Sequence, residues 1–208
     1  MHTKGYGNIP DELFLLHNIF NPSATPRSVK TFIELLMGSL LTQSGFVTSA
    51  IWILDMARQW PGYYKWLETG HWSYLKLMRQ WTALFLKLIG DNPVYLAIDD
   101  SIVLRHSKKV SMSQIHHQHG NKTNLSRYVR GQCRVALAAI VKRSGCNMAL
   151  LLLLRLTPQA GNSGKLVIAR SLIRALMEPL KDKAVTVLVD SWYMRRSFIE
   201  QRWLKPAF

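Results

Sequence analysis

The residues best suited to chemistry are aspartates that follow two short apolar runs. Residues 95–100 read YLAIDD and residues 185–190 read VTVLVD. Each run is typical of a buried strand that stops on aspartate. If the two strands are parallel neighbours, roughly 4.8 Å apart, Asp99 and Asp190 converge at the carboxyl edge of the sheet, where open α/β sheets keep their sites. Converging carboxylates in a basic chain indicate a divalent metal ion acting on a phosphate backbone.

The charge of the chain favours a polyanionic partner. Its 208 residues include 27 Lys and Arg but 12 Asp and Glu, a formal net charge of +15. Between Asp100 and Glu178 lie 13 Lys and Arg and no acidic residue. Exposed faces normally mix both signs, so we interpret this segment as a nucleic-acid-binding surface. The candidate phosphate contacts, each equally compatible with a solvated side chain, are Lys108, Lys109, Lys122, Arg127 and Arg130.

Other features of the sequence bear on the compartment. The two cysteines, Cys133 and Cys146, lack metal-ligand spacing, and the first 20 residues lack a signal-peptide pattern. Residues 35–54 are uncharged over a membrane-spanning length, but their polar centre, TQSG, predicts two buried helices joined by a turn. Basic residues are interleaved with strands, which disfavours a membrane-surface protein. We therefore expect a cytoplasmic protein that associates with the nucleoid through DNA and does not contact a membrane.

The N-terminal part of the chain has helical periodicity. Helices are predicted at residues 13–20, 29–41, 46–56, 63–67 and 72–89. Residues 29–56 have the outline of a helix-turn-helix, although any helical bundle produces the same outline. The turn sequence GDNP at residues 90–93 marks a boundary. Residues 1–91 are thus predicted to form a helical region that is a candidate for DNA binding.

The C-terminal part of the chain alternates strands and helices. Strands are predicted at residues 94–100, within 128–141, at 148–156 and at 185–190, with the third buried on both faces because of its leucine-rich composition. Helices are predicted at residues 165–180 and 195–203. Three hairpin-joined strands run antiparallel, and the helix then carries the chain to a fourth strand that docks beside the first in parallel. The predicted class is α/β (α+β), with the strand order of a partial ribonuclease-H-like sheet over residues 92–208.

These segments resemble the DDE transposases of bacterial insertion sequences. LAIDDS at residues 96–101 resembles their first catalytic strand, YVRGQ at 128–132 their second strand, and LVDSWY at 188–193 the segment with the second aspartate. The resemblance covers most of residues 30–208. It implies that Asp99 and Asp190 are catalytic ligands of Mg²⁺ or Mn²⁺. Strand alternation points Asp100 to the other face, and Asp99 is favoured while the choice between the two stays open.

The resemblance implies metal-dependent cleavage and transfer of double-stranded DNA at transposon ends, and it is compatible with a homodimer in the DNA complex. The family's third acid, a glutamate well after the second aspartate, has no match. Glu200 lies too near Asp190, and Glu178 precedes it. The chain resembles a transposase cut before that glutamate, so we expect weak or no activity from it alone. The alternative is a DNA-binding remnant that occupies transposon ends or modulates the intact enzyme without catalysis.

A histidine-rich segment, HHQH at residues 116–119, raises a zinc hypothesis. His117 and His119 share one face of a strand, but no cysteine or acidic residue has a suitable spacing. A polar loop near DNA is the favoured interpretation.

Overall fold

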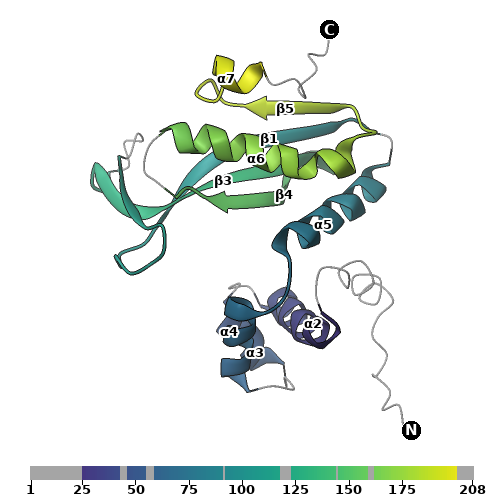
Figure 1. Cartoon of the computed structure of the whole chain (residues 1–208), viewed down its shortest axis with the longest axis vertical. Coiled ribbons are helices and arrows are strands. Elements are labelled where there is room, and N and C mark those ends of the chain that lie inside the picture. The colour runs from purple at the N-terminus through teal and green to yellow at the C-terminus, as the bar shows by residue number, and fades with distance from the viewer. Residues whose placement is uncertain are drawn as a thin grey trace. The chain divides into compact units, whose positions relative to one another are not determined.

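The structure, a computed structural model of the whole chain, describes residues 25–42, 46–54, 59–90, 92–117, 123–143, 145–158 and 162–200 (Figure 1). The helix expected at residues 13–20 lies outside these ranges. The described residues form six helices and one five-stranded mixed sheet. The chain divides into two compact units, Met1–Phe85 and Leu86–Phe208. The division falls inside helix α5, ahead of the turn at residues 90–93 where the sequence predicts a boundary.

The first unit is helical. Leu35, Tyr63 and Trp66 form its buried cluster, and the Trp66 ring stacks on Trp72 with centroids 5.7 Å apart. The uncharged stretch at residues 35–54 belongs to two separate helices, as predicted. The expectation that both are buried is wrong, since Leu40, Leu41 and Trp52 are 65%, 54% and 85% exposed. No helix in the described ranges has the length and apolar character needed to cross a membrane. The helices are α2 (Pro26–Leu41), α3 (Val47–Ile53), α4 (Trp60–Thr69) and α5 (Tyr74–Ile89), the last of which runs into the second unit.

The second unit is built on the sheet. Its central strand, β3, pairs antiparallel with β1 on one side and with both β2 and β4 on the other. Strand β5 pairs with β1 in parallel, with Ile98 opposite Val189. The expected parallel pairing of the two aspartate-bearing segments is therefore confirmed. The strands are β1 (Val94–Leu104), β2 (Gln114–His117), β3 (Tyr128–Arg143), β4 (Cys146–Leu156) and β5 (Val185–Val189).

One face of the sheet packs against helix α6 (Asn162–Leu180), which crosses it in Figure 1. Leu96 of β1 and Leu137 of β3 are fully buried, as is Leu176 of α6. Alternate residues of a strand point to opposite faces, so Leu96 and Leu137 show which residues of β1 and β3 point inward. Burial of such apolar side chains is the main source of stability for this packing.

The first strand does not stop on aspartate, contrary to expectation. Pairing with β5 ends at Ile98, but β3 continues to pair with β1 as far as Leu104. Gly131 of β3 permits this extension, because a Cβ there would lie 2.6 Å from the Val103 carbonyl oxygen. Asp99 and Asp100 therefore lie within a strand, at the point where its parallel neighbour ends.

Two further differences concern β2 and β4. The sequence predicts a linker where the structure has β2, because a four-residue strand is too short for a clear apolar period. Strand β4 was expected to be buried on both faces, but Met148 and Leu151 are 54% and 47% exposed. Its apolar composition suggested two covered faces, whereas α6 covers one face and β4 lies at the margin of the sheet.

Candidate active site

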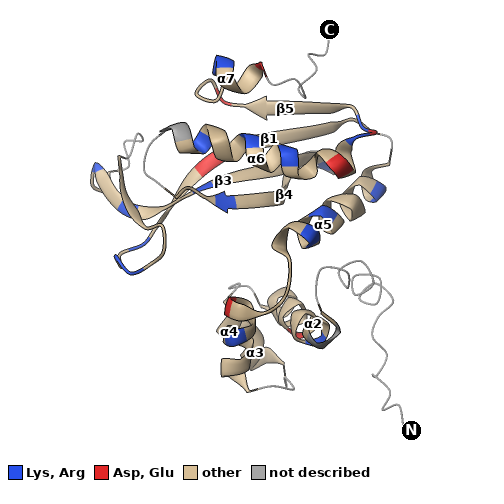
Figure 2. Ribbon diagram, in the orientation of Figure 1, with Lys and Arg blue, Asp and Glu red and all other residues tan. Residues whose placement is uncertain are grey.

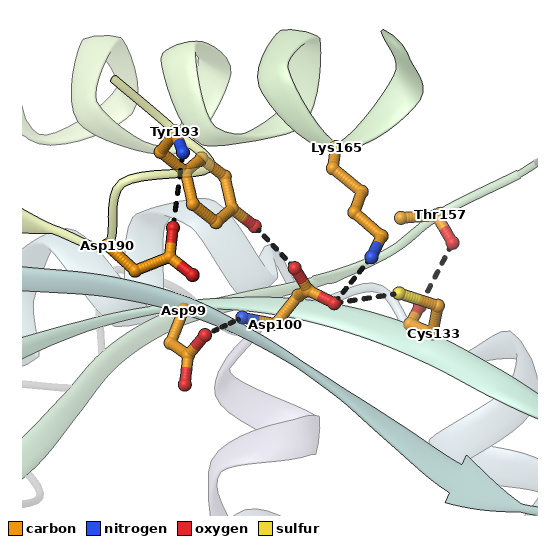
Figure 3. A network of polar contacts seen from close by, with 7 residues as sticks. All are labelled: Asp99, Asp100, Cys133, Thr157, Lys165, Asp190 and Tyr193. Atoms are coloured by element: carbon orange, nitrogen blue, oxygen red, sulfur yellow. Dashed lines mark hydrogen bonds and ion pairs between the residues drawn. The ribbon is translucent and has the colours of Figure 1, made fainter. Parts of the chain in front are cut away.

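Asp100, and not Asp99, lies on the face of the sheet that packs against α6. Leu96 and Ile98 of β1 are 0% and 3% exposed, and Asp100 follows them with the same parity. Asp99 has the parity of Tyr95 and is exposed. Figure 3 shows the two aspartate side chains on opposite sides of β1. The expectation that the two aspartates point to opposite faces is therefore confirmed, and the face that packs against α6 is that of Asp100.

Both carboxylate oxygens of Asp100 have partners. Lys165 Nζ, at the start of α6, lies 2.7 Å from Oδ2, and the Tyr193 hydroxyl donates to Oδ1 at 3.0 Å. The Cys133 thiol is 3.7 Å from Oδ2. The two charged side chains, Lys165 and Asp100, are 21% and 18% exposed. A pair this shielded from water is screened less than a surface pair.

Tyr193 connects the two aspartates that the parallel strands bring together. Asp190 directly follows β5, and its Oδ1 accepts a hydrogen bond of 3.1 Å from the Tyr193 backbone N–H. The Tyr193 phenol then reaches Asp100, so both carboxylates lie toward one residue (Figure 3). Burial raises the pKa of Tyr193 above its usual value, and the charge of Asp100 raises it further. The hydroxyl therefore stays protonated and remains a donor to Asp100.

Asp99 makes a local contact. Its Oδ1 accepts the backbone N–H of Asp100 at 2.7 Å. The structure thus unites Asp100 and Asp190 through Tyr193, and it does not place the Asp99 side chain in this network.

Cys133 supports the same network from β3. Its side chain is 1% exposed, and burial raises the pKa of the thiol. The neighbouring Thr157 donates to the Cys133 carbonyl through both its N–H and its hydroxyl, at 2.9 and 3.2 Å. A neutral thiol is a weak donor, so Cys133 adds to the polar surroundings of Asp100 without adding charge.

Sequence reasoning missed Lys165, Tyr193 and Cys133 as site residues. The sequence contains one usable signal, because Tyr193 lies three residues after Asp190 and an aspartate often accepts backbone N–H groups of the turn that it begins. Lys165 and Cys133 reach Asp100 from distant parts of the chain, and no local pattern indicates either contact.

The predicted phosphate contacts gather beyond the carboxyl end of β1. Lys108 and Lys109 are exposed in the loop between β1 and β2, where Figure 2 shows basic residues. Arg127 is exposed before β3, and Arg130 lies within β3 and donates to the Ser113 carbonyl at 3.4 Å. Lys122 lies outside the described residues. The four described cations thus belong to segments beside the carboxyl end of β1 at Leu104, which pairs with Gly131.

The histidines of the predicted loop occupy β2. His116 Nε2 lies 3.1 Å from the Gly131 carbonyl oxygen, whereas His117 accepts from Arg127 Nε at 3.0 Å and packs edge-on against Tyr128. His119 lies outside the described residues. No group of three His, Cys, Asp or Glu in the described ranges is arranged to hold a metal ion. The zinc hypothesis thus gains no support from His116 and His117.

The chemistry of Asp100 and Asp190 suits a hard divalent cation. Mg²⁺ prefers oxygen ligands, keeps several waters, and is commonly held by one or two carboxylates together with substrate phosphates. Glu200 is engaged elsewhere, since its Oε1 lies 2.7 Å from Arg196 Nε. Glu178 pairs with Lys181 near the end of α6. The carboxylates of Asp100 and Asp190 are therefore of the ligand type that such an ion takes.

No protein-family model matches this chain, and no curated protein matches it. The resemblance noted from the sequence therefore depends on its three short motifs.

Proposed function

We propose that this chain is a DDE-type transposase, or a fragment of one, with a ribonuclease-H-like sheet unit in which Asp100 and Asp190 hold Mg²⁺ or Mn²⁺. The observation that carries the proposal is the link between these carboxylates. They belong to parallel neighbours, β1 and β5, and both bond to Tyr193. The pairing of β1 with β3 and β5, and of β3 with β4, supports the ribonuclease-H-like assignment.

Asp100 replaces Asp99 as the proposed first ligand. A ligand must share the site with Asp190, and the Tyr193 link provides that only for Asp100. Held by Asp100 and Asp190, Mg²⁺ or Mn²⁺ would supply activation of a water or 3′-hydroxyl and charge stabilisation at the leaving oxygen of the phosphate. Tyr193 orients Asp100, and Lys108, Lys109, Arg127 and Arg130 bind the backbone of double-stranded DNA.

The test is Mn²⁺ binding to the purified chain by calorimetry. Asp100→Asn and Asp190→Asn should each weaken binding by roughly tenfold or more, because each removes a charged ligand. Asp99→Asn is the matched control, since it removes the same charge one residue away, and it should leave the affinity within about twofold. Loss of binding in Asp99→Asn alone would show that the wrong aspartate has been chosen.

The same variants can be tested on supercoiled plasmid DNA with Mn²⁺. With two carboxylates and no third acid joined to them in the described residues, weak nicking is expected from wild type and none from Asp100→Asn. Robust nicking that disappears in Asp100→Asn would support the site but would contradict the expectation of weak activity. Nicking that persists in Asp100→Asn and Asp190→Asn would contradict the proposed site.

The second candidate function is DNA binding without catalysis. The exposed cations Lys108, Lys109 and Arg127 favour it, because they need no metal to bind phosphate. Replacing all three with alanine should reduce the slope of log affinity against log salt by roughly 0.9 for each lost contact. An unchanged slope would exclude these residues as contacts. Wild-type DNA affinity that is insensitive to Mn²⁺ and to Asp190→Asn would favour this function over the first.

A further inference from the structure

The Lys165 ammonium group occupies a position beside Asp100 that a metal ion would also require. It lies 2.7 Å from Asp100 Oδ2, and it also lies 5.4 Å from the ring centroid of Trp192. Trp192 belongs to the turn that follows Asp190. The ammonium is therefore held between the strand that bears the first aspartate and the turn that bears the second.

We propose that Lys165 is an exchangeable cation, which neutralises Asp100 in the metal-free protein and becomes a contact to the DNA phosphate once a divalent ion takes its place. This inference rests on the proposed metal site at Asp100 and Asp190. Lys165 is then a substrate-binding residue.

Electrostatics favours the exchange. Among the described residues, Lys165 is the Lys or Arg that forms an ion pair with Asp100. A divalent ion at the same distance attracts a carboxylate twice as strongly as an ammonium, because Coulomb energy scales with charge. The displaced ammonium and the incoming ion repel each other, so the lysine must move, and a bound phosphate offers it a new anionic partner.

The surroundings of Lys165 allow it to move without leaving the site. Its side chain is 21% exposed, so part of it already reaches solvent. A lysine head is a compact point charge on a flexible stem, and it binds phosphate well in that form. The negative face of the Trp192 ring attracts the ammonium and keeps it close to the site. The lysine can thus change partners while its helix stays in place.

Mn²⁺ titration of Lys165→Met tests the first half of the inference. Without DNA, this variant should bind Mn²⁺ roughly tenfold more tightly than wild type, because no ammonium has to be displaced. Lys165→Arg keeps the charge and should remain close to wild type. Lys142→Met removes an exposed cation of β3 that has no contact with the site and should change nothing. Urea unfolding of each variant confirms that it folds.

The salt dependence of duplex DNA binding tests the second half. With Mn²⁺, Lys165→Met should lower the slope of log affinity against log salt by roughly 0.9, the loss of one phosphate contact. In EDTA the slopes of Lys165→Met and wild type should be equal, because Lys165 of the wild type is then paired with Asp100 and contacts no phosphate. For Lys142→Met, the difference in slope from wild type should be the same with Mn²⁺ and with EDTA.

The outcomes separate this inference from the proposed function. If neither wild type nor Lys165→Met binds Mn²⁺, the metal site itself is wrong, and the inference fails with it. If both bind with equal affinity, the metal site stands and the exchange is wrong. An equal loss of slope with and without Mn²⁺ would make Lys165 a permanent phosphate contact and would also overturn the exchange.

Discussion

Replacing Asp100 with alanine should destabilise the sheet unit far more than replacing Asp99. Asp100→Ala removes the acceptor of the Tyr193 hydroxyl, which belongs to a side chain only 1% exposed. It also leaves Lys165 without its carboxylate partner. Asp99→Ala removes one exposed contact to the neighbouring backbone N–H. The two substitutions are chemically identical and adjacent, so each serves as a control for the other.

The magnitude follows from these contacts. A buried donor left without an acceptor costs about 1–3 kcal/mol. The ion pair adds about 1 kcal/mol after allowance for its partial exposure, since surface pairs contribute little. Asp100→Ala should therefore lower the free energy of unfolding by about 2–4 kcal/mol. Asp99→Ala should change it by at most about 0.5 kcal/mol, as is usual for surface positions. Asp100→Asn should fall between them, because its amide oxygen can still accept from Tyr193.

Urea unfolding followed by circular dichroism measures these differences. Because the chain has two compact units and both cysteines lie in the sheet unit, the transition should also be followed by thiol labelling of buried Cys133, which reports on that unit alone. The midpoint should fall for Asp100→Ala at unchanged slope. Equal losses in Asp99→Ala and Asp100→Ala would refute the assignment of the inward face, and with it the choice of Asp100 as a site residue.

Three other predictions concern the same structure. Because the pKa of Tyr193 is raised on folding, its contribution to stability is intact below the unfolded pKa of about 10 and is lost as the pH rises above it. Urea unfolding at alkaline pH should show the free energy of unfolding of wild type falling by up to about 1.4 kcal/mol per pH unit more than that of Tyr193→Phe. Iodoacetamide should modify exposed Cys146 in the folded protein and Cys133 only after unfolding, as mass spectrometry will detect. Gly38→Ala should cost about 1–3 kcal/mol in thermal or urea unfolding, because its Cβ would lie 2.6 Å from the Ala50 carbonyl oxygen.

The strand pair could be predicted from the sequence, but the face of each aspartate could not. The runs before Asp100 and Asp190 are apolar and short, which is enough to expect two strands that pair in parallel. The expected burial of the second run is wrong, since Val185 and Leu188 of β5 are 37% and 45% exposed. In residues 95–98 every position is apolar or aromatic, so the run contains no alternation that marks the inward parity. Packing against α6 decides the parity, because Leu96 and Ile98 are buried while Tyr95 is 43% exposed.

Local sequence patterns also could not predict the strands at the margin of the sheet, β2 and β4. Strand β2 exists because β3 is long enough to pair with two partners along one edge, and a four-residue segment has no period of its own. The leucines of β4 predict burial, but burial depends on what covers the strand. Leu152 and Leu153 are buried beside α6, whereas Leu151 is not. Composition measures the tendency to be buried, and tertiary packing decides which residues are.

The position of Asp190 depends on aromatic packing beyond its own strand. Strand β5 has five residues, pairs with β1 alone in the described part of the sheet, and leaves Leu188 45% exposed. The carboxyl end of such an edge strand is only weakly fixed by the strand's own contacts. Tyr193 supplies the missing constraint, because its buried ring packs near Phe198 of α7 (Arg196–Ile199), with centroids 6.3 Å apart. Its backbone then fixes Asp190 while its hydroxyl fixes Asp100. Tyr193 therefore fixes both carboxylates from one residue, which is the preorganisation that the proposed metal site requires.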